Sequence, residues 1–126
     1  GDTQLTFSQE IKMDGAIIVS TPQEVALLDV KRGIKMFDKL GVKILGLVDN
    51  MSFFIGDDGK KYKIFGEGGV KKTSEEFQKE FLGEIPISPK VGEAGDRGEP
   101  IVENDPEHEI SKIFLDMAKK IKKIYL

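Results

Sequence analysis

Two short, continuously apolar segments, residues 16–19 and 44–48, constrain the fold of this 126-residue chain more than any other feature. Runs of this kind are typical of strands that are covered on both faces. Between them, apolar residues recur at helical spacing, and Gly41 lies where a left-handed cap ends a helix. A strand, a helix and a strand in this order predict parallel pairing through a right-handed crossover. The inner stripe of that helix is formed by Leu27, Val30, Ile34 and Phe37.

The predicted first helix begins with a capping box. Thr21 is the expected N-cap, Pro22 occupies the first helical position and Glu24 the third. Beyond the second strand, residues 51–65 are apolar and aromatic but are interrupted by Gly-Asp-Asp-Gly at 56–59. This pattern predicts a hairpin with a tight turn.

Three further elements complete the expected fold. Residues 69–79 indicate a short polar helix, and residues 82–87 a third strand that Pro86 and Pro89 end. The last helix is expected to start at Asp105 and Pro106. Its apolar stripe is Ile110, Ile113, Phe114, Met117, Ile121 and Tyr125.

The first residues of the chain indicate what kind of domain this is. Residues 6–11 resemble a crossover helix, yet no strand precedes them. A crossover helix requires an earlier strand. The predicted fold class is therefore α/β, the C-terminal half of a doubly wound, mostly parallel sheet with a β-hairpin insertion. Residues 1–126 are expected to form a single partial domain.

Composition excludes several classes of function. The net charge of −3 and a pI near 5.3 leave no basic face for nucleic acid. No apolar run is long enough to span a bilayer, and no signal peptide opens the chain. The absence of cysteine excludes disulfides and thiolate metal sites, and it is compatible with the cytoplasmic location that we expect.

Asn50 stands at the carboxyl end of the second strand, in residues 48–54, and the glycine-rich residues 64–69 follow ten residues further on. Ligands of open parallel sheets bind beyond such strand ends. An amide side chain has both a donor and an acceptor, as the recognition of a nucleobase edge requires. The alternative is that Asn50 only closes a turn, a common role for asparagine.

The single histidine and the C-terminal lysines are expected to have structural rather than functional roles. His108 is expected in the first turn of the last helix, with no cysteine or second histidine to share a metal. The cations near the C-terminal end of that helix favour its dipole rather than marking a membrane or phosphate site. These cations are Lys119, Lys120, Lys122 and Lys123.

Several motifs occur in the order found in a known family. They are Gly-Asp-x-Gln-Leu-Thr at residues 1–6, Thr-Pro-Gln-Glu-Val-Ala-Leu-Leu-Asp-Val at 21–30, Asp-Asn-Met-Ser at 49–52, Ile-Phe-Gly-Glu-Gly-Gly at 64–69 and Leu-Gly-Glu-Ile-Pro at 82–86. With these motifs the chain resembles the Mrp/ApbC family of MinD-like P-loop ATPases, which are implicated as iron–sulfur cluster carriers. The resemblance covers nearly the whole chain.

The resemblance implies ATP and magnesium as cofactors of the longer family members. Gly1 and Asp2 resemble the end of a switch segment near the γ-phosphate and magnesium. Asn50 matches the position expected to contact adenine, so that base recognition is favoured over the turn role. Pro86 and Ile87 begin the loop expected to pack its backbone against the base. No phosphate-binding Gly-x-x-x-x-Gly-Lys-Ser/Thr motif is present, so the chain itself holds no catalytic residue and is expected not to hydrolyse ATP.

The predicted hairpin departs from the family. Related carriers have Cys-x-x-Cys where this chain has Gly-Asp-Asp-Gly-Lys at residues 56–60, and two such motifs across a dimer can supply the four thiolates of a [4Fe–4S] cluster. No cluster ligand replaces these cysteines here. Asp57 and Asp58 offer too few oxygens for calcium, so a solvated turn is the preferred interpretation.

Two functions follow. The first is part of an ATP-binding iron–sulfur cluster carrier, with a homo-oligomer and iron–sulfur client proteins as expected partners. The second is a non-enzymatic, MinD-like partner-binding or regulatory scaffold. In either case residues 16–19 are expected to lie at an apolar sheet edge that promotes self-association, which replacing Ile18 with Lys should reduce.

Overall fold

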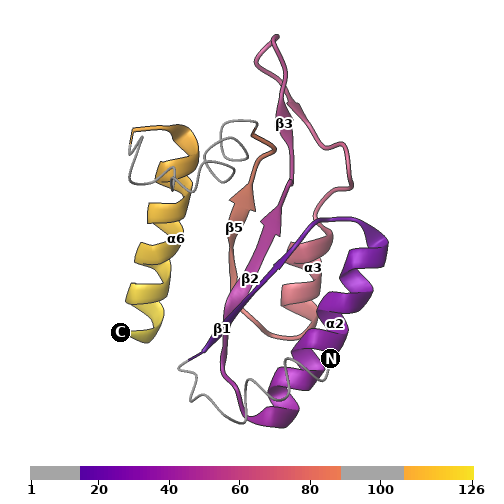
Figure 1. The fold of residues 1–126 in the computed structure, drawn as a ribbon, viewed down its shortest axis with the longest axis vertical. Coiled ribbons are helices and arrows are strands. Elements are labelled where there is room, and N and C mark those ends of the chain that lie inside the picture. Colours follow the sequence, from indigo (N-terminus) through magenta and orange to yellow (C-terminus); the bar gives the residue numbers. More distant parts are fainter. Residues whose placement is uncertain (1–14, 89–106) are drawn as a thin grey trace, which may run out of the picture.

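A parallel three-stranded sheet forms the centre of the computed structural model, which describes residues 15–88 and 107–126. Its strands are β1 (Ala16–Ser20), β2 (Ile44–Asn50) and β5 (Phe81–Ile85), in the order β1-β2-β5. Helices α2 (Glu24–Leu40) and α3 (Gly69–Glu76) cover one face, and α6 (Glu109–Tyr125) lies on the other (Figure 1). The α/β class and the parallel pairing are confirmed.

Two apolar clusters hold these layers together. On one face of the sheet, Leu47 packs with the predicted α2 stripe, in which Val30 and Ile34 are buried and Leu27 and Phe37 partly so. On the other face, Val48 and Leu82 pack against Met117 of α6, with further α6 residues around them. The alternation of Leu47 and Val48 between two cores explains why β2 is continuously apolar.

The C-terminal end of α2 agrees with the expectation, whereas its N-terminal end does not. Gly41 caps the helix in the left-handed conformation (φ 73°), as predicted. The capping box at Thr21 is wrong: the N-cap is Gln23 and makes no side-chain capping bond, while the Thr21 hydroxyl bonds to the Gln23 side chain at 3.3 Å. Pro22 is buried beneath Gly66, where a Cβ would lie 2.8 Å from the Pro22 carbonyl oxygen. Gln23 follows this contact in an extended conformation (φ −68°, ψ 141°), and the helix starts only at Glu24.

Three other boundaries shift. Helix α3 ends at Glu76 rather than residue 79, because Gln78 adopts a positive φ of 57°. Strand β5 spans Phe81–Ile85 rather than residues 82–87, since Pro86 has no N–H to continue the ladder. Helix α6 begins at Glu109 with His108 as its N-cap, and the expected start at residues 105 and 106 lies outside the described residues.

The start of α6 also gives His108 a different role from the one expected. It is the N-cap residue rather than part of the first turn, and its Nδ1 accepts a hydrogen bond from the Ile110 amide at 3.1 Å. An imidazole nitrogen with a free lone pair can cap in the way that a hydroxyl or carboxylate does. The histidine is therefore engaged locally.

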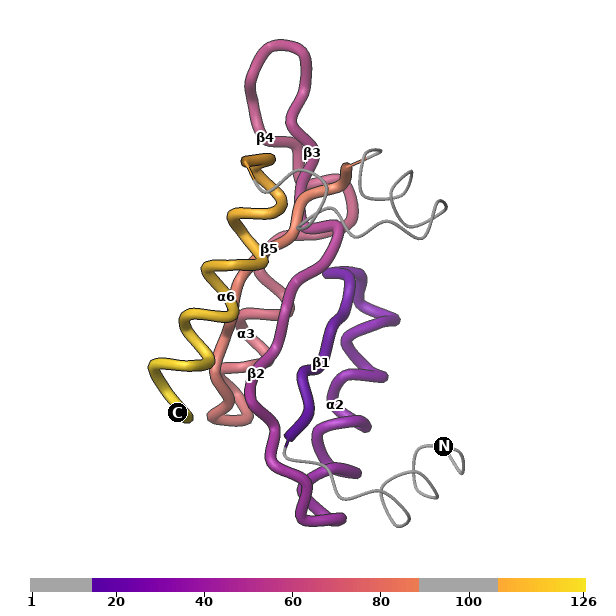
Figure 2. Tube along the Cα trace, turned by 60° about the vertical axis from the view of Figure 1, so that its left-hand side comes forward, coloured from indigo at the N-terminus to yellow at the C-terminus, as the bar shows by residue number. Residues whose placement is uncertain are grey.

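The predicted hairpin is present and projects beyond the end of the main sheet (Figures 1 and 2). Its strands are β3 (Phe54–Ile55) and β4 (Lys61–Tyr62), which pair antiparallel. At the tip, the Gly59 amide bonds to the Gly56 carbonyl at 2.9 Å, and Gly59 has φ 77°. The predicted turn at residues 56–59 is confirmed.

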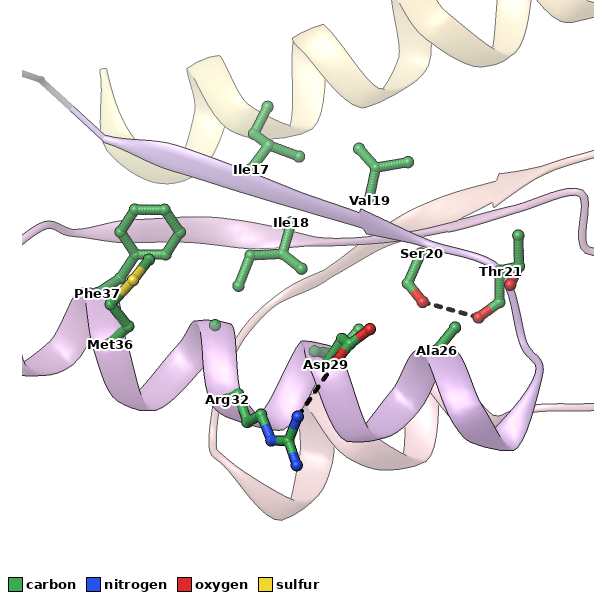
Figure 3. Close-up of a pocket in the computed structure, with 12 residues that line it drawn as sticks. Ile17, Ile18, Val19, Ser20, Thr21, Ala26, Asp29, Arg32, Met36 and Phe37 are labelled. Carbon is green, nitrogen blue, oxygen red and sulfur yellow. Dashed lines mark hydrogen bonds and ion pairs between the residues drawn. The ribbon is translucent and has the colours of Figure 1, made fainter. Parts of the chain in front are cut away.

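Strand β1 is covered on one face only, contrary to the expectation from its apolar sequence. Ile18 and Ser20 point toward α2, whereas Ile17 and Val19 point to the opposite side and are 43% and 56% exposed (Figure 3). In the described residues β1 pairs only with β2, so its outer edge is open. A groove of about 760 Å³ runs between this edge and α2, where Gly33 leaves space beside the helix.

This geometry changes the variant that tests self-association. Ile18 packs against the buried core, so replacing it with Lys would damage the fold as well as the edge. Val19→Lys leaves that core intact and places a charge on the open strand, which disfavours pairing with another chain. We expect it to raise the apparent dissociation constant of self-association at least tenfold, measured by light scattering across a concentration series.

The matched control is Val25→Lys. Val25 is 73% exposed on α2 and does not line the groove beside β1, so the variant should associate like the wild type. A wild-type chain that remains monomeric at high concentration, or a Val25→Lys variant that loses association equally, contradicts the role of β1.

Candidate functional site

The carboxyl ends of the three parallel strands meet at one edge of the sheet, where the candidate site lies. Ser20, Asp49 and Glu84 are adjacent in register across β1, β2 and β5. The next residue of β2, Asn50, pairs with Ile85. The sheet thus brings polar groups from distant parts of the chain to the position where ligands of such folds bind.

A tight turn follows Asn50. Met51 has a positive φ of 55°, which is uncommon for a residue with a side chain. The Asn50 Oδ1 stabilises this conformation by accepting a hydrogen bond from the Met51 amide at 3.0 Å. The turn-forming role of Asn50 is therefore observed, and among the described residues its Nδ2 donor has no hydrogen-bond partner.

Two backbone hydrogen bonds join this turn to the end of β5. The Ser52 amide donates to the Ile85 carbonyl at 3.0 Å, and the Ile87 amide donates to the Phe53 carbonyl at 2.7 Å. These bonds place the chain at Pro86 and Ile87 beside the turn that Asn50 begins. Pro86 is buried and Ile87 is partly exposed. Of the five predicted site residues, three come together here, while Gly1 and Asp2 lie outside the described residues.

Asp49 is a prominent polar residue of this edge that sequence reasoning did not single out. Its side chain is 1% exposed; Oδ2 accepts a hydrogen bond from the Ser52 hydroxyl at 3.2 Å, and Oδ1 has no partner. Burial raises the pKa of the Asp49 carboxyl; the Ser52 bond lowers it, Glu84 raises it and Lys63 lowers it. The available signal was an acidic residue ending an otherwise apolar strand, with a serine three residues on.

The raised pKa has a consequence for stability. A group whose pKa is higher in the folded than in the unfolded state contributes most below its unfolded pKa, and that contribution is lost as pH rises through the folded pKa. Asp49→Asn removes this titration. As pH rises from 4 to 7, we expect the free energy of unfolding of the wild type to fall relative to that of Asp49→Asn. The expected change is on the order of 1 kcal/mol, the cost of an unpaired buried acceptor.

Urea unfolding at several pH values measures this difference. Asp57→Asn is the matched control, because Asp57 is exposed at the hairpin turn, and its curve should run parallel to the wild type. Parallel curves for Asp49→Asn as well would show that Asp49 does not titrate as the geometry requires.

The hairpin tip is held by its own polar groups. Asp58 accepts hydrogen bonds from the Tyr62 hydroxyl and, at 3.0 Å, from the Lys60 amide, and these lower the pKa of its carboxyl. Within residues 15–88 and 107–126, no group of three or more His, Cys, Asp or Glu side chains is placed to hold a metal. With no cysteine in the sequence, this site does not fit an iron–sulfur cluster.

Comparison with known proteins settles the family. Residues 1–122 match the model of the ParA family described as NUBPL iron-transfer P-loop NTPase. The chain belongs to this family. It is 43% identical over 125 residues to the iron–sulfur cluster carrier protein of Aquifex aeolicus and 47% identical over 123 residues to that of Synechocystis. These alignments cover 98% and 96% of the chain but 34% and 35% of the relatives, so the chain spans about a third of their length.

Solved structures support the fold class. A nucleotide-binding protein of Archaeoglobus fulgidus, in complex with ADP, superimposes with a TM-score of 0.68 at 37% identity, covering 78% of this chain and 41% of that one. The cell division protein MinD of Aquifex aeolicus also gives a TM-score of 0.68, covering 98% of this chain and 48% of its own. At 23% identity it shows the fold alone. The predicted P-loop NTPase class and the Mrp/ApbC resemblance are confirmed.

None of the helices in the described ranges is long and apolar enough to cross a bilayer.

Proposed function

We propose that this chain supplies the base-side wall of the nucleotide site in an ATP-binding, iron–sulfur cluster carrier type of P-loop NTPase. The proposal rests on two backbone hydrogen bonds, one from the Ser52 amide to the Ile85 carbonyl and one from the Ile87 amide to the Phe53 carbonyl. Together these bonds hold Asn50 beside Pro86 and Ile87. The names of the relatives as cluster carriers, and the ADP complex of the Archaeoglobus protein, support this assignment.

The chemistry of Asn50 suits adenine. Its Nδ2 donor can reach the adenine N7 while the second lone pair of Oδ1 accepts from N6, the bidentate pattern that asparagine makes with this base. Guanine presents two acceptors at the same edge, so only one of these bonds can form. The Pro86–Ile87 backbone is proposed to pack against the face of the base. Gly1 and Asp2 are proposed as the residues nearest magnesium and the phosphates, and the open edge of β1 as the place where a P-loop strand pairs.

Titration with ADP, followed by amide chemical shifts, tests this proposal. We expect saturable shifts at the Asn50 and Ile87 amides, weak because only base contacts contribute, and at least threefold smaller affinity for GDP. Asn50→Asp keeps the acceptor that Met51 needs but loses the Nδ2 donor to N7, so it should weaken the response to ADP while the turn remains. Equal responses to ADP and GDP in the wild type would overturn the role of Asn50.

We assign iron–sulfur cluster binding, the second part of the proposed function, to the longer protein and its partners. This chain offers no thiolate, so any iron–sulfur cluster that passes through the assembly is cargo bound by other residues. Homo-oligomerisation and iron–sulfur client proteins are proposed on the same basis.

One observation favours a second function, the partner-binding scaffold. The hairpin, which projects from the sheet, exposes four large apolar side chains. Exposed apolar residues gathered on one element are typical of protein interaction surfaces. The four exposed apolar residues of the hairpin are Phe54, Ile55, Tyr62 and Ile64. A chain whose Asn50 variants leave nucleotide response unchanged, but whose hairpin variants lose partner binding, would support the scaffold.

A further inference from the structure

A side-chain hydrogen bond stabilises the turn at residues 50–53 on the face of the sheet opposite to Asn50. Asp49 and Asn50 are consecutive strand residues and therefore point to opposite faces of the sheet. On its own face, Asp49 reaches across the turn to the Ser52 hydroxyl. Ser52 is itself 1% exposed, and its amide is bonded to Ile85. One buried side-chain pair thus ties the end of β2 to the residue that links the turn to β5.

We propose that Asp49 is a positioning residue, which through Ser52 clamps the turn between β2 and the Pro86–Ile87 segment and so fixes the direction in which Asn50 presents its amide. The inference deepens the proposed function and rests on it for the ligand. Asp49 has no role in touching the base, because it is buried on the opposite face.

The surroundings of Asp49 make the clamp responsive to protonation. The charged groups that act on it are Glu84 on β5 and Lys63 just beyond β4, which also face each other at 3.6 Å. From α3, which packs over β2, the buried side chains are Val70, Thr73 and Ser74 rather than charges. The Oδ1 atom is buried without a partner, so the ionised carboxyl is solvated poorly when the turn is closed.

Linkage then fixes the direction of the response. Opening the turn exposes Asp49 to water and returns its pKa toward the ordinary value, whereas the closed turn raises that pKa. The closed turn therefore binds the proton more tightly. Acidification favours the clamped turn, and rising pH loosens it.

Hydrogen exchange on the full 126-residue chain tests the clamp directly. The reporters are the Ser52 and Ile87 amides. The reference is the Leu47 amide of β2, which bonds at 2.9 Å to the carbonyl of Glu80, the residue before β5. In Ser52→Ala, protection of the reporters relative to Leu47 should fall at least tenfold. Ser74→Ala is the matched control: Ser74 is equally buried and bonds to the Lys71 carbonyl, and its loss should leave the ratio unchanged.

A second measurement separates positioning from a general structural role. In the wild type, the ratio of Ser52 to Leu47 protection should fall as pH rises through the Asp49 titration, whereas in Asp49→Asn it should be flat. An unchanged ratio in Ser52→Ala, or the same pH dependence in Asp49→Asn as in the wild type, overturns the clamp.

The effect of the clamp on ligand binding is measured by the amide chemical-shift changes that ADP causes in the same samples. Ser52→Ala should weaken the Asn50 response to ADP at least threefold, although Asn50 is intact. If the wild type shows the exchange behaviour but no ADP response, the proposed base contact fails and the clamp stands. If ADP binds equally well to Ser52→Ala with loosened reporters, the clamp does not position Asn50.

Discussion

The 126-residue chain alone is expected to give no ATP turnover above background. Phosphoryl transfer depends on backbone amides and a lysine that surround the phosphates, and the sequence contains no Gly-x-x-x-x-Gly-Lys-Ser/Thr motif to provide them. Removing a single preorganised donor from a site of this kind costs on the order of 10²–10³ in rate. Loss of the complete phosphate cradle therefore removes activity rather than reducing it.

A phosphate-release assay in the presence of magnesium measures this outcome. The Aquifex aeolicus carrier protein, purified by the same steps, is the reference sample. Turnover that persists through further purification and disappears in Asn50→Ala would contradict the prediction, because it would place a working phosphate site within these residues. The same assay on Asn50→Ala also reveals contaminating ATPases, whose activity the substitution cannot change.

Anaerobic reconstitution with iron and sulfide is expected to leave no stable cluster on the wild-type chain. Cluster irons are held by cysteine thiolates, in some cases with histidines, and this sequence has no cysteine and one histidine. That histidine is the N-cap of α6. The carboxylate of Asp58 at the hairpin tip is bonded to Tyr62 and Lys60.

A gain-of-function variant gives this prediction its control. Asp57→Cys combined with Lys60→Cys creates a Cys-x-x-Cys pair at the hairpin tip. One chain would then supply two thiolates, and two chains would supply four, so a cluster should appear only in a dimer. A visible absorption band that survives desalting of the wild-type chain would show that other residues can hold the iron.

The central layer of the fold could be predicted because its signals are local. The apolar runs of β1 and β2, the helical stripe of α2 and the glycine at residue 41 each express one strong physical preference, and the structure confirms all four. Helix starts were predicted less well. Thr21 has the chemistry of a cap, but Pro22 packs against Gly66 and the helix starts only after Gln23. Contacts over forty residues of sequence are not visible in a local pattern.

The candidate site was predicted in part for a similar reason. Asn50, Pro86 and Ile87 were identified by resemblance, and the structure brings their segments together through two backbone bonds. Asp49 was overlooked because its significance depends on burial and on an oxygen without a partner, which only the packed structure reveals. The apolar run of β1 alone indicated cover on both faces, whereas Ile17 and Val19 are exposed on one of them, in keeping with the apolar sheet edge that was expected for residues 16–19.

A chimera tests the central claim most directly. In it, these 126 residues replace the matching third of the Aquifex aeolicus carrier protein, to which they are 43% identical. If the chain supplies the base-side wall, the folded chimera should bind ATP within about tenfold of the parent, and Asn50→Ala should weaken ATP binding about tenfold, as expected for loss of a hydrogen-bonding pair worth about 1–3 kcal/mol. A folded chimera that fails to bind ATP, or binds it equally well with and without Asn50, would contradict the account.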